Sequence, residues 1–146
     1  MPGSISDLQQ RLAEQHYVID RGLAVSLFIA LRLGRPLFLE GEAGVGKTAL
    51  AAATAAALGT DLIRLQCYEG LDISHAVYEW DYPRQLLELR VLEASGALDR
   101  AATHQALYGD AFLLKRPLLQ AIDPARTRPA VLLIDEIGRA SCRERV

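Results

Sequence analysis

The chain has 146 residues, of which 51% are apolar and 23% are charged, and its formal net charge is −2. These values predict one globular domain with a hydrophobic core and argue against a disordered tail. The near balance of charge argues against the strongly basic surface of a nucleic-acid-binding protein. Every uninterrupted apolar run is far shorter than the roughly 18–20 residues that cross a bilayer. We therefore expect neither a nucleic-acid partner nor a membrane span.

The N-terminus lacks the apolar segment of a secretory signal. The two cysteines, Cys67 and Cys142, have neither the spacing of a metal site nor that of a disulfide framework. Both observations lead us to expect a cytoplasmic location.

Helical spacing of apolar residues predicts four helices, and Gly34 is expected to end the second of them. The third is Ala-rich, which favours a helix that approaches a sheet closely. A further segment, 110–122, is expected to be partly helical, with a break at Pro117. The four helices are expected over 4–15, 21–33, 48–58 and 84–94.

Short apolar runs predict strands over 36–40, 61–66 and 129–135. The segment 67–83 is expected to be irregular. Its aromatic residues could grip another protein chain or simply pack beneath a long loop, and the sequence leaves both open. Because the strands alternate with helices, the sequence predicts an α/β layered fold.

The strongest motif is the run Gly41-Glu42-Ala43-Gly44-Val45-Gly46-Lys47-Thr48, which fits G-x-x-x-x-G-K-[ST]. It lies between a predicted strand and a predicted helix. Its glycines allow the backbone to curl around a phosphate, and the start of the helix adds amide N–H groups. Lys47 is expected to reach the β- and γ-phosphates, and the Thr48 hydroxyl to bind Mg²⁺. A glycine-rich turn would explain the glycines but not Gly-Lys-Thr at a helix start.

A second acidic motif closes the predicted strand 129–135, where four apolar residues are followed by Asp135 and Glu136. The carboxyl ends of parallel strands are where α/β sheets bind ligands. Asp135 is expected to hold Mg²⁺ through its water shell, and Glu136 to orient and deprotonate the attacking water. Acids that merely end a buried strand are the alternative, but their position downstream of a phosphate loop favours a catalytic role.

These residues resemble the AAA+ ATPases, and specifically the MoxR family. The resemblance covers about residues 15–136 and is strongest in 35–48, 66–72 and 78–87. The last two segments resemble the branch associated with carbon monoxide dehydrogenase and other molybdenum hydroxylases. The resemblance implies an ATP- and Mg²⁺-dependent chaperone or remodeller that forms a ring, expected to be hexameric, and acts on a protein client such as a molybdenum hydroxylase. It also implies that adenine packs near Tyr17, Val18 and Ile19.

Three alternative functions remain open, and the simplest is a phosphate-loop module that binds nucleotide without turnover. A phosphotransferase with a phosphate loop would need an acid or an arginine pair for its acceptor and no base at Glu136. An AAA+ subunit of a nucleic-acid-acting complex would need a basic groove, which the net charge of −2 does not favour.

The last ten residues, 137–146, show no periodicity and match one translated frame of a sequencing adapter. We therefore expect residues 1–136 to be the N-terminal part of a nucleotide-binding domain and 137–146 to be an artefact. The adapter would overlap the codon of Glu136 but not that of Asp135. The family fold is a three-layer sandwich with a mostly parallel sheet in the order 5-1-4-3-2. Strands 4 and 5 and the helical lid would then be missing, and we expect the fragment alone to fold poorly and to be inactive.

Overall fold

The structure, a computed structural model, describes residues 1–95 and 100–137. Three helices come first: α1 (Ile5–Glu14), α2 (Arg21–Leu33) and α3 (Lys47–Leu58). The prediction of these helices is confirmed to within one residue at each end. Gly34 ends α2 in the left-handed conformation, with φ 60°, as expected of a helix C-terminal glycine.

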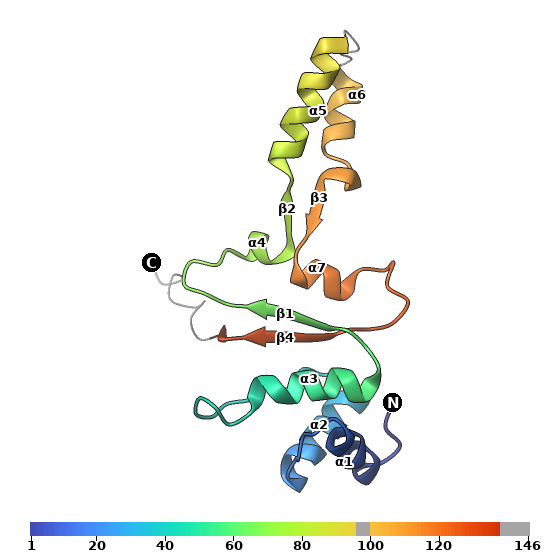
Figure 1. Ribbon diagram of the computed structural model, residues 1–146, viewed down its shortest axis with the longest axis vertical. Helices are drawn as coiled ribbons and strands as arrows, with labels where there is room; N and C mark the ends of the chain where they lie inside the picture. The colour runs from blue at the N-terminus through green and yellow to red at the C-terminus, as the bar shows by residue number, and fades with distance from the viewer. Residues whose placement is uncertain (96–99, 138–146) are drawn as a thin grey trace.

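The first three helices share a hydrophobic core. Leu8 and Leu12 of α1 are fully buried, and they pack with Leu27 of α2 and Leu50 of α3 in one cluster. The spacing of Leu8 and Leu12 places both on one face of α1, so this helix packs against α2 and α3 through that apolar face. This core supports α3 from below (Figure 1).

Strands β1 (Leu62–Gln66) and β4 (Val131–Asp135) form a parallel pair. Helix α3 packs on one face of this pair and α7 (Pro117–Ile122) on the other. The predicted strands 61–66 and 129–135 are therefore confirmed, and they are neighbours. The α/β class is confirmed as well, although the sheet described here is a small parallel pair.

The strand predicted over 36–40 is wrong in this structure, because these residues have no sheet partner within the described ranges. The segment is still placed by packing: Leu37 and Leu39 contact the core of the first three helices, whereas Phe38 between them is 72% exposed. Alternation of this kind is typical of an extended chain. A strand also needs hydrogen bonds to a neighbour, and in the expected sheet order its neighbours are strands 4 and 5.

The segment between β1 and α7 contains more regular structure than expected. Helix α4 (Ile73–Val77) and strand β2 (Tyr78–Trp80) lie within the stretch that was predicted to be irregular. Strand β2 pairs antiparallel with β3 (Leu113–Lys115), which follows a 3₁₀ turn at Asp110–Phe112. The prediction that 67–83 is irregular is therefore wrong in part. A segment as short as β2 forms a strand only when it is hydrogen-bonded to a partner, here β3.

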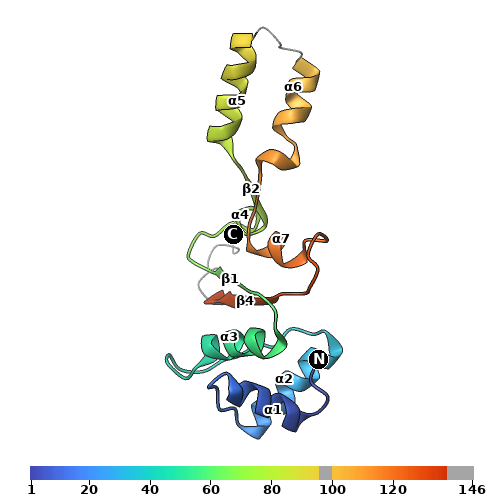
Figure 2. The same cartoon turned by 45° about the vertical axis from the view of Figure 1, so that its right-hand side comes forward.

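Two further helices, α5 (Tyr82–Ser95) and α6 (Arg100–Leu107), project from the β2–β3 pair as a hairpin (Figures 1 and 2). The expected helix 84–94 is confirmed as α5, and Asp81 extends its start because its carboxylate accepts a hydrogen bond from the Arg84 amide. Helix α6 was not predicted. The break at Pro117 is confirmed, because Pro117 begins α7, a position where its missing N–H costs nothing.

Within the described residues, no helix is long and apolar enough to cross a membrane. The terminal segment 137–146 lies outside the described residues except for Ile137.

Candidate nucleotide-binding site

The loop 41–46 leads directly into α3 and lies at the same side of the molecule as the carboxyl ends of β1 and β4 (Figure 1). Gly44 and Gly46 have φ angles of 85° and 90°, a region that residues with a Cβ rarely adopt. The glycines at these positions therefore allow the loop to curl. Glu42, Ala43 and Val45 are exposed along it.

Helix α3 begins with an N-cap that no side chain occupies, since Gly46 makes no side-chain capping bond. The first amide N–H groups of a helix have no partner within the helix. Together with the helix dipole, such a terminus favours an anion. The start of α3 thus has the chemistry that a phosphate group requires.

Lys47 folds back over the loop. Its Nζ atom donates hydrogen bonds to the carbonyl oxygens of Gly41, at 2.7 Å, and Glu42, at 2.6 Å. The two carbonyls hold the ammonium group above the curled backbone. A phosphate bound in the loop would offer the same ammonium group a charged acceptor, and charge-assisted hydrogen bonds are stronger than those to neutral carbonyls.

Thr48 and Asp135 are brought together from positions far apart in the sequence. The Thr48 hydroxyl, in the first turn of α3, donates to Oδ2 of Asp135 at 3.4 Å. Asp135 is the last residue of β4, so its carboxylate stands at the carboxyl edge of the sheet. A hydroxyl and a carboxylate are oxygen donors of the kind that Mg²⁺ prefers, directly or through water. The two residues therefore fit the expected magnesium site.

The same carboxylate has a second partner that the sequence analysis did not identify. Nη2 of Arg64, on β1, lies 2.7 Å from Oδ2 of Asp135. Burial alternates along β1, with Ile63 and Leu65 buried and Arg64 between them exposed. A basic residue on the less buried face of a strand beside β4 is the signal that could have pointed to Arg64.

Glu136 follows Asp135 directly and is exposed, with φ 58°. A non-glycine residue in the left-handed region is uncommon and often marks a functional position. Its expected catalytic role stays a prediction.

The three residues expected near adenine have different surroundings. Tyr17 lies against the loop: its hydroxyl donates to the Gly46 carbonyl at 3.4 Å. Ile19 is buried in the core of the first three helices, whereas Val18 is 93% exposed. Tyr17 is thus the residue of the three that contacts the phosphate loop.

Cys67 lies immediately beyond β1, and its amide donates to the Asp135 carbonyl at 2.8 Å. Burial, and next to it the negative charge of Asp135, raise the pKa of the Cys67 thiol. A raised pKa keeps the thiol protonated and poorly nucleophilic. Cys67 is buried in one cluster with Leu65 and Ala76, so its role is packing.

The aromatic residues of 67–83 do not form one cluster. Trp80 packs edge-on against Tyr108 of the chain segment that follows α6, with ring centroids 5.3 Å apart. Tyr68 and Tyr82 are 56% and 62% exposed. The packing interpretation therefore holds for Trp80, whereas contact of Tyr68 and Tyr82 with another protein chain stays a prediction.

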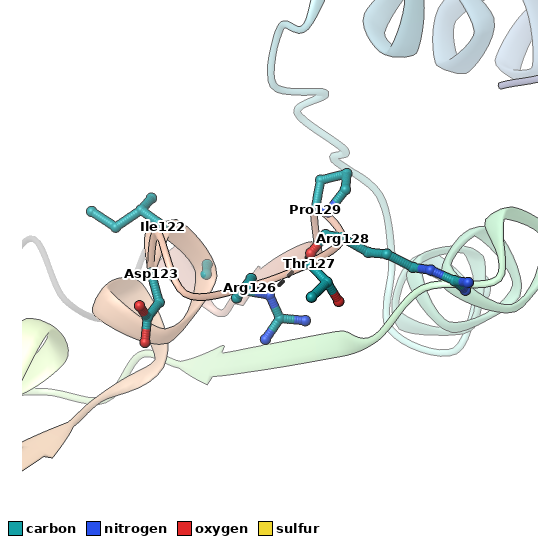
Figure 3. A pocket seen from close by; sticks show the side chains of 7 residues that line it. Ile122, Asp123, Arg126, Thr127, Arg128 and Pro129 are labelled. Atoms are coloured by element: carbon teal, nitrogen blue, oxygen red, sulfur yellow. Dashed lines mark hydrogen bonds between the residues drawn. The ribbon is translucent and has the colours of Figure 1, made fainter.

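A separate hollow of about 200 Å³ lies before β4 (Figure 3). Two of its charged residues pair with residues outside the hollow: Asp123 binds Lys115, and Arg126 binds Asp61. It precedes β4 in the chain, whereas Asp135 ends that strand, so the hollow lies at the opposite edge of the sheet from the phosphate loop.

Comparison with known proteins agrees with this geometry. The family model of the AAA domain (dynein-related subfamily) matches residues 36–144. Midasin from Giardia intestinalis is 49% identical over 45 residues, which is 31% of this chain and 1% of midasin. The chain thus spans about 1% of the length of this curated relative. No solved structure matches.

Proposed function

Because the chain belongs to the AAA domain family of the dynein-related subfamily, we propose that it binds ATP with Mg²⁺ and hydrolyses the bond between the β- and γ-phosphates. Membership in this family implies the phosphate-loop fold and ATP binding. The further step to hydrolysis rests on Glu136 beside Asp135.

One observation carries the proposal: Thr48 and Asp135 approach to 3.4 Å beside the loop that Lys47 closes. In the proposed reaction the amides of the loop and of the first turn of α3 bind the phosphates, and Lys47 places its charge on the β- and γ-phosphate oxygens. Thr48 and Asp135 would hold Mg²⁺, which supplies charge neutralisation at those oxygens. Glu136 orients the attacking water and accepts its proton.

The proposed biological role is that of a MoxR-type ATPase that remodels a protein client during metalloenzyme maturation. The segments 66–72 and 78–87 support this branch by their resemblance. They form the end of β1 and the connection to α4, and then β2 with the start of α5. A ring of identical subunits, with a molybdenum hydroxylase as client, belongs to the same proposal. A neighbouring molybdenum hydroxylase gene would support it.

The chain offers a matched test of the phosphate loop, because Lys47 and Lys115 are its two lysines. Lys115 pairs with Asp123 at 2.6 Å, away from the phosphate loop. We expect Lys47→Ala in the complete gene product to weaken the binding of a fluorescent ADP analogue about 10- to 100-fold. This range corresponds to the loss of one charge-assisted hydrogen-bonding group, about 1.5–3 kcal/mol.

Lys115→Ala is the control and should bind the analogue as the unsubstituted protein does. Equal affinity in both lysine variants would refute the proposed nucleotide site. Glu136→Gln then tests the chemistry: nucleotide should stay bound while release of inorganic phosphate without an added acceptor is lost. Phosphate transfer only in the presence of an acceptor would support a phosphotransferase instead.

A further inference from the structure

Arg64 and Thr48 share one carboxylate oxygen of Asp135 at the proposed magnesium site. Oδ2 of Asp135 accepts from Arg64 at 2.7 Å and from Thr48 at 3.4 Å. The shorter of the two contacts is the charged one, so in the nucleotide-free protein the guanidinium group is the stronger partner of this oxygen.

The backbone fixes this arrangement. Arg64 of β1 is in register with Leu133 of β4, and Gln66 is in register with Asp135. Side chains two positions apart lie on the same face of a sheet, so Arg64 and Asp135 are diagonal neighbours on one face. Leu65, between Arg64 and Gln66, packs in the cluster that includes Leu118 of α7. Arg64 therefore lies on the face that α3 covers, and Thr48 lies in the first turn of that helix.

The charge of Arg64 also opposes a cation at this place. Its side chain is 49% exposed and that of Asp135 is 23% exposed, so water screens the pair only in part. If Thr48 and Asp135 held Mg²⁺, directly or through water, Arg64 would compete with the cation for the Asp135 carboxylate and would leave a second positive charge near it.

From this juxtaposition we propose that Arg64 is a positioning residue that holds Asp135 in the nucleotide-free protein and thereby sets the Mg²⁺ concentration at which nucleotide binds. The inference rests on the proposed function, because it requires that Thr48 and Asp135 take up Mg²⁺ with the nucleotide. When Mg²⁺ and nucleotide arrive, Arg64 releases Oδ2, and the phosphates provide the negative charge that compensates for its displacement.

The test is a Mg²⁺ titration of the binding of a fluorescent ADP analogue to the complete gene product. No turnover is needed, so the readout is independent of hydrolysis. Arg64→Met removes both the hydrogen bond and the charge, and Arg64→Gln is a second neutral variant in case the first folds poorly. For a partly exposed pair, we expect half-maximal binding at about three- to tenfold lower Mg²⁺ in the neutral variants.

Two further variants isolate the cause. Arg64→Lys keeps a positive charge and should stay closer to the unsubstituted protein than Arg64→Met does. Arg11→Met is the matched control, since Arg11 forms a bridge to Asp7 at 2.8 Å with a partly exposed side chain like that of Arg64. It should leave the Mg²⁺ requirement unchanged. Circular dichroism establishes that each variant is folded.

The outcomes separate this inference from the function on which it rests. If the neutral variants need the same Mg²⁺ concentration or more, Arg64 does not restrain Asp135 and the inference is overturned. If the unsubstituted protein binds no nucleotide at any Mg²⁺ concentration, the proposed function itself fails and the inference fails with it.

Discussion

Replacing Gly46 by alanine tests whether backbone conformation makes the loop a phosphate site. Gly46 has φ 90° and is followed by α3, while Gly59 ends the same helix with φ 62°. A Cβ atom at Gly46 would lie 3.6 Å from the ring of Tyr17, an ordinary contact, and one at Gly59 would meet nothing within 4 Å. Neither substitution causes a clash, so the backbone angle determines the cost at both positions.

The magnitude follows from two opposing terms. A residue with a Cβ in the left-handed region costs about 1–2 kcal/mol, and the smaller entropy of the unfolded chain returns about 0.4–1 kcal/mol. The net loss of unfolding free energy is then about 1 kcal/mol for either variant, which lowers the Tm of the complete gene product by about 2–4 °C. Gly46→Ala should lie at the upper end of this range, because φ 90° is further from the left-handed minimum.

Nucleotide binding distinguishes the two variants. Relief of the strain at position 46 turns the peptide groups of the loop, so we expect Gly46→Ala to weaken binding of the ADP analogue at least tenfold. Gly59→Ala lies at the far end of α3 and should bind normally at a temperature where both variants are folded. Thermal melts and a fluorescence titration measure the two effects, and equal nucleotide affinity in the two variants would show that the reasoning about the loop is mistaken.

Two predictions concern stability away from the site. Asp20 caps α2 by accepting from the amides of Gly22 and Leu23, at 2.8 and 3.1 Å, so Asp20→Ala should lower the unfolding free energy by about 1 kcal/mol, while Asp20→Asn should retain most of it in urea denaturation. The hydrogen bond from Lys115, and then that from the Ala125 amide, hold the pKa of Asp123 below its usual range. A lowered pKa in the folded state gives stability that is present above about pH 4 and is lost as the pH falls through the folded-state pKa. Asp123 in turn raises the pKa of Lys115, and that contribution is present below about pH 10.4 and is lost as the pH rises through the folded-state pKa. Asp123→Asn should therefore flatten both limbs of the stability profile measured from thermal melts between pH 2 and 12, and unchanged limbs would contradict the assignment.

The phosphate loop and its flanking helix could be predicted because their signals are local. The curvature of the loop follows from its glycines, and its positive charge follows from Lys47, all within residues 41–48. The helices α1 and α2 likewise follow from the spacing of apolar residues. Gly34 ends α2 because glycine, which lacks a Cβ atom, adopts the left-handed conformation at little cost. The acidic end of β4 was predictable because four apolar residues directly precede Asp135.

Other features depend on partners that are distant in the sequence. Strands β2 and β3 have three residues each and are separated by the α5–α6 hairpin, so neither segment indicates a strand until the two are paired. The stretch 36–40 shows the converse: it is apolar enough for a strand, yet its backbone has no sheet neighbour among the described residues. Hydrogen bonding between strands is a property of the pair, and a single segment does not contain it.

The sequence by itself determined which groups can meet a phosphate, because loop curvature, the helix terminus and the Lys47 charge are encoded in eight consecutive residues, 41–48. The tertiary structure decided which groups meet each other. The parallel register of β1 and β4 brings Arg64 to Oδ2 of Asp135, and the packing of α3 across the two strands brings Thr48 to the same oxygen. Arg64 and Asp135 are 71 positions apart in the chain, and the residues between them contain no local signal of that contact, since it arises from the pairing of β1 with β4.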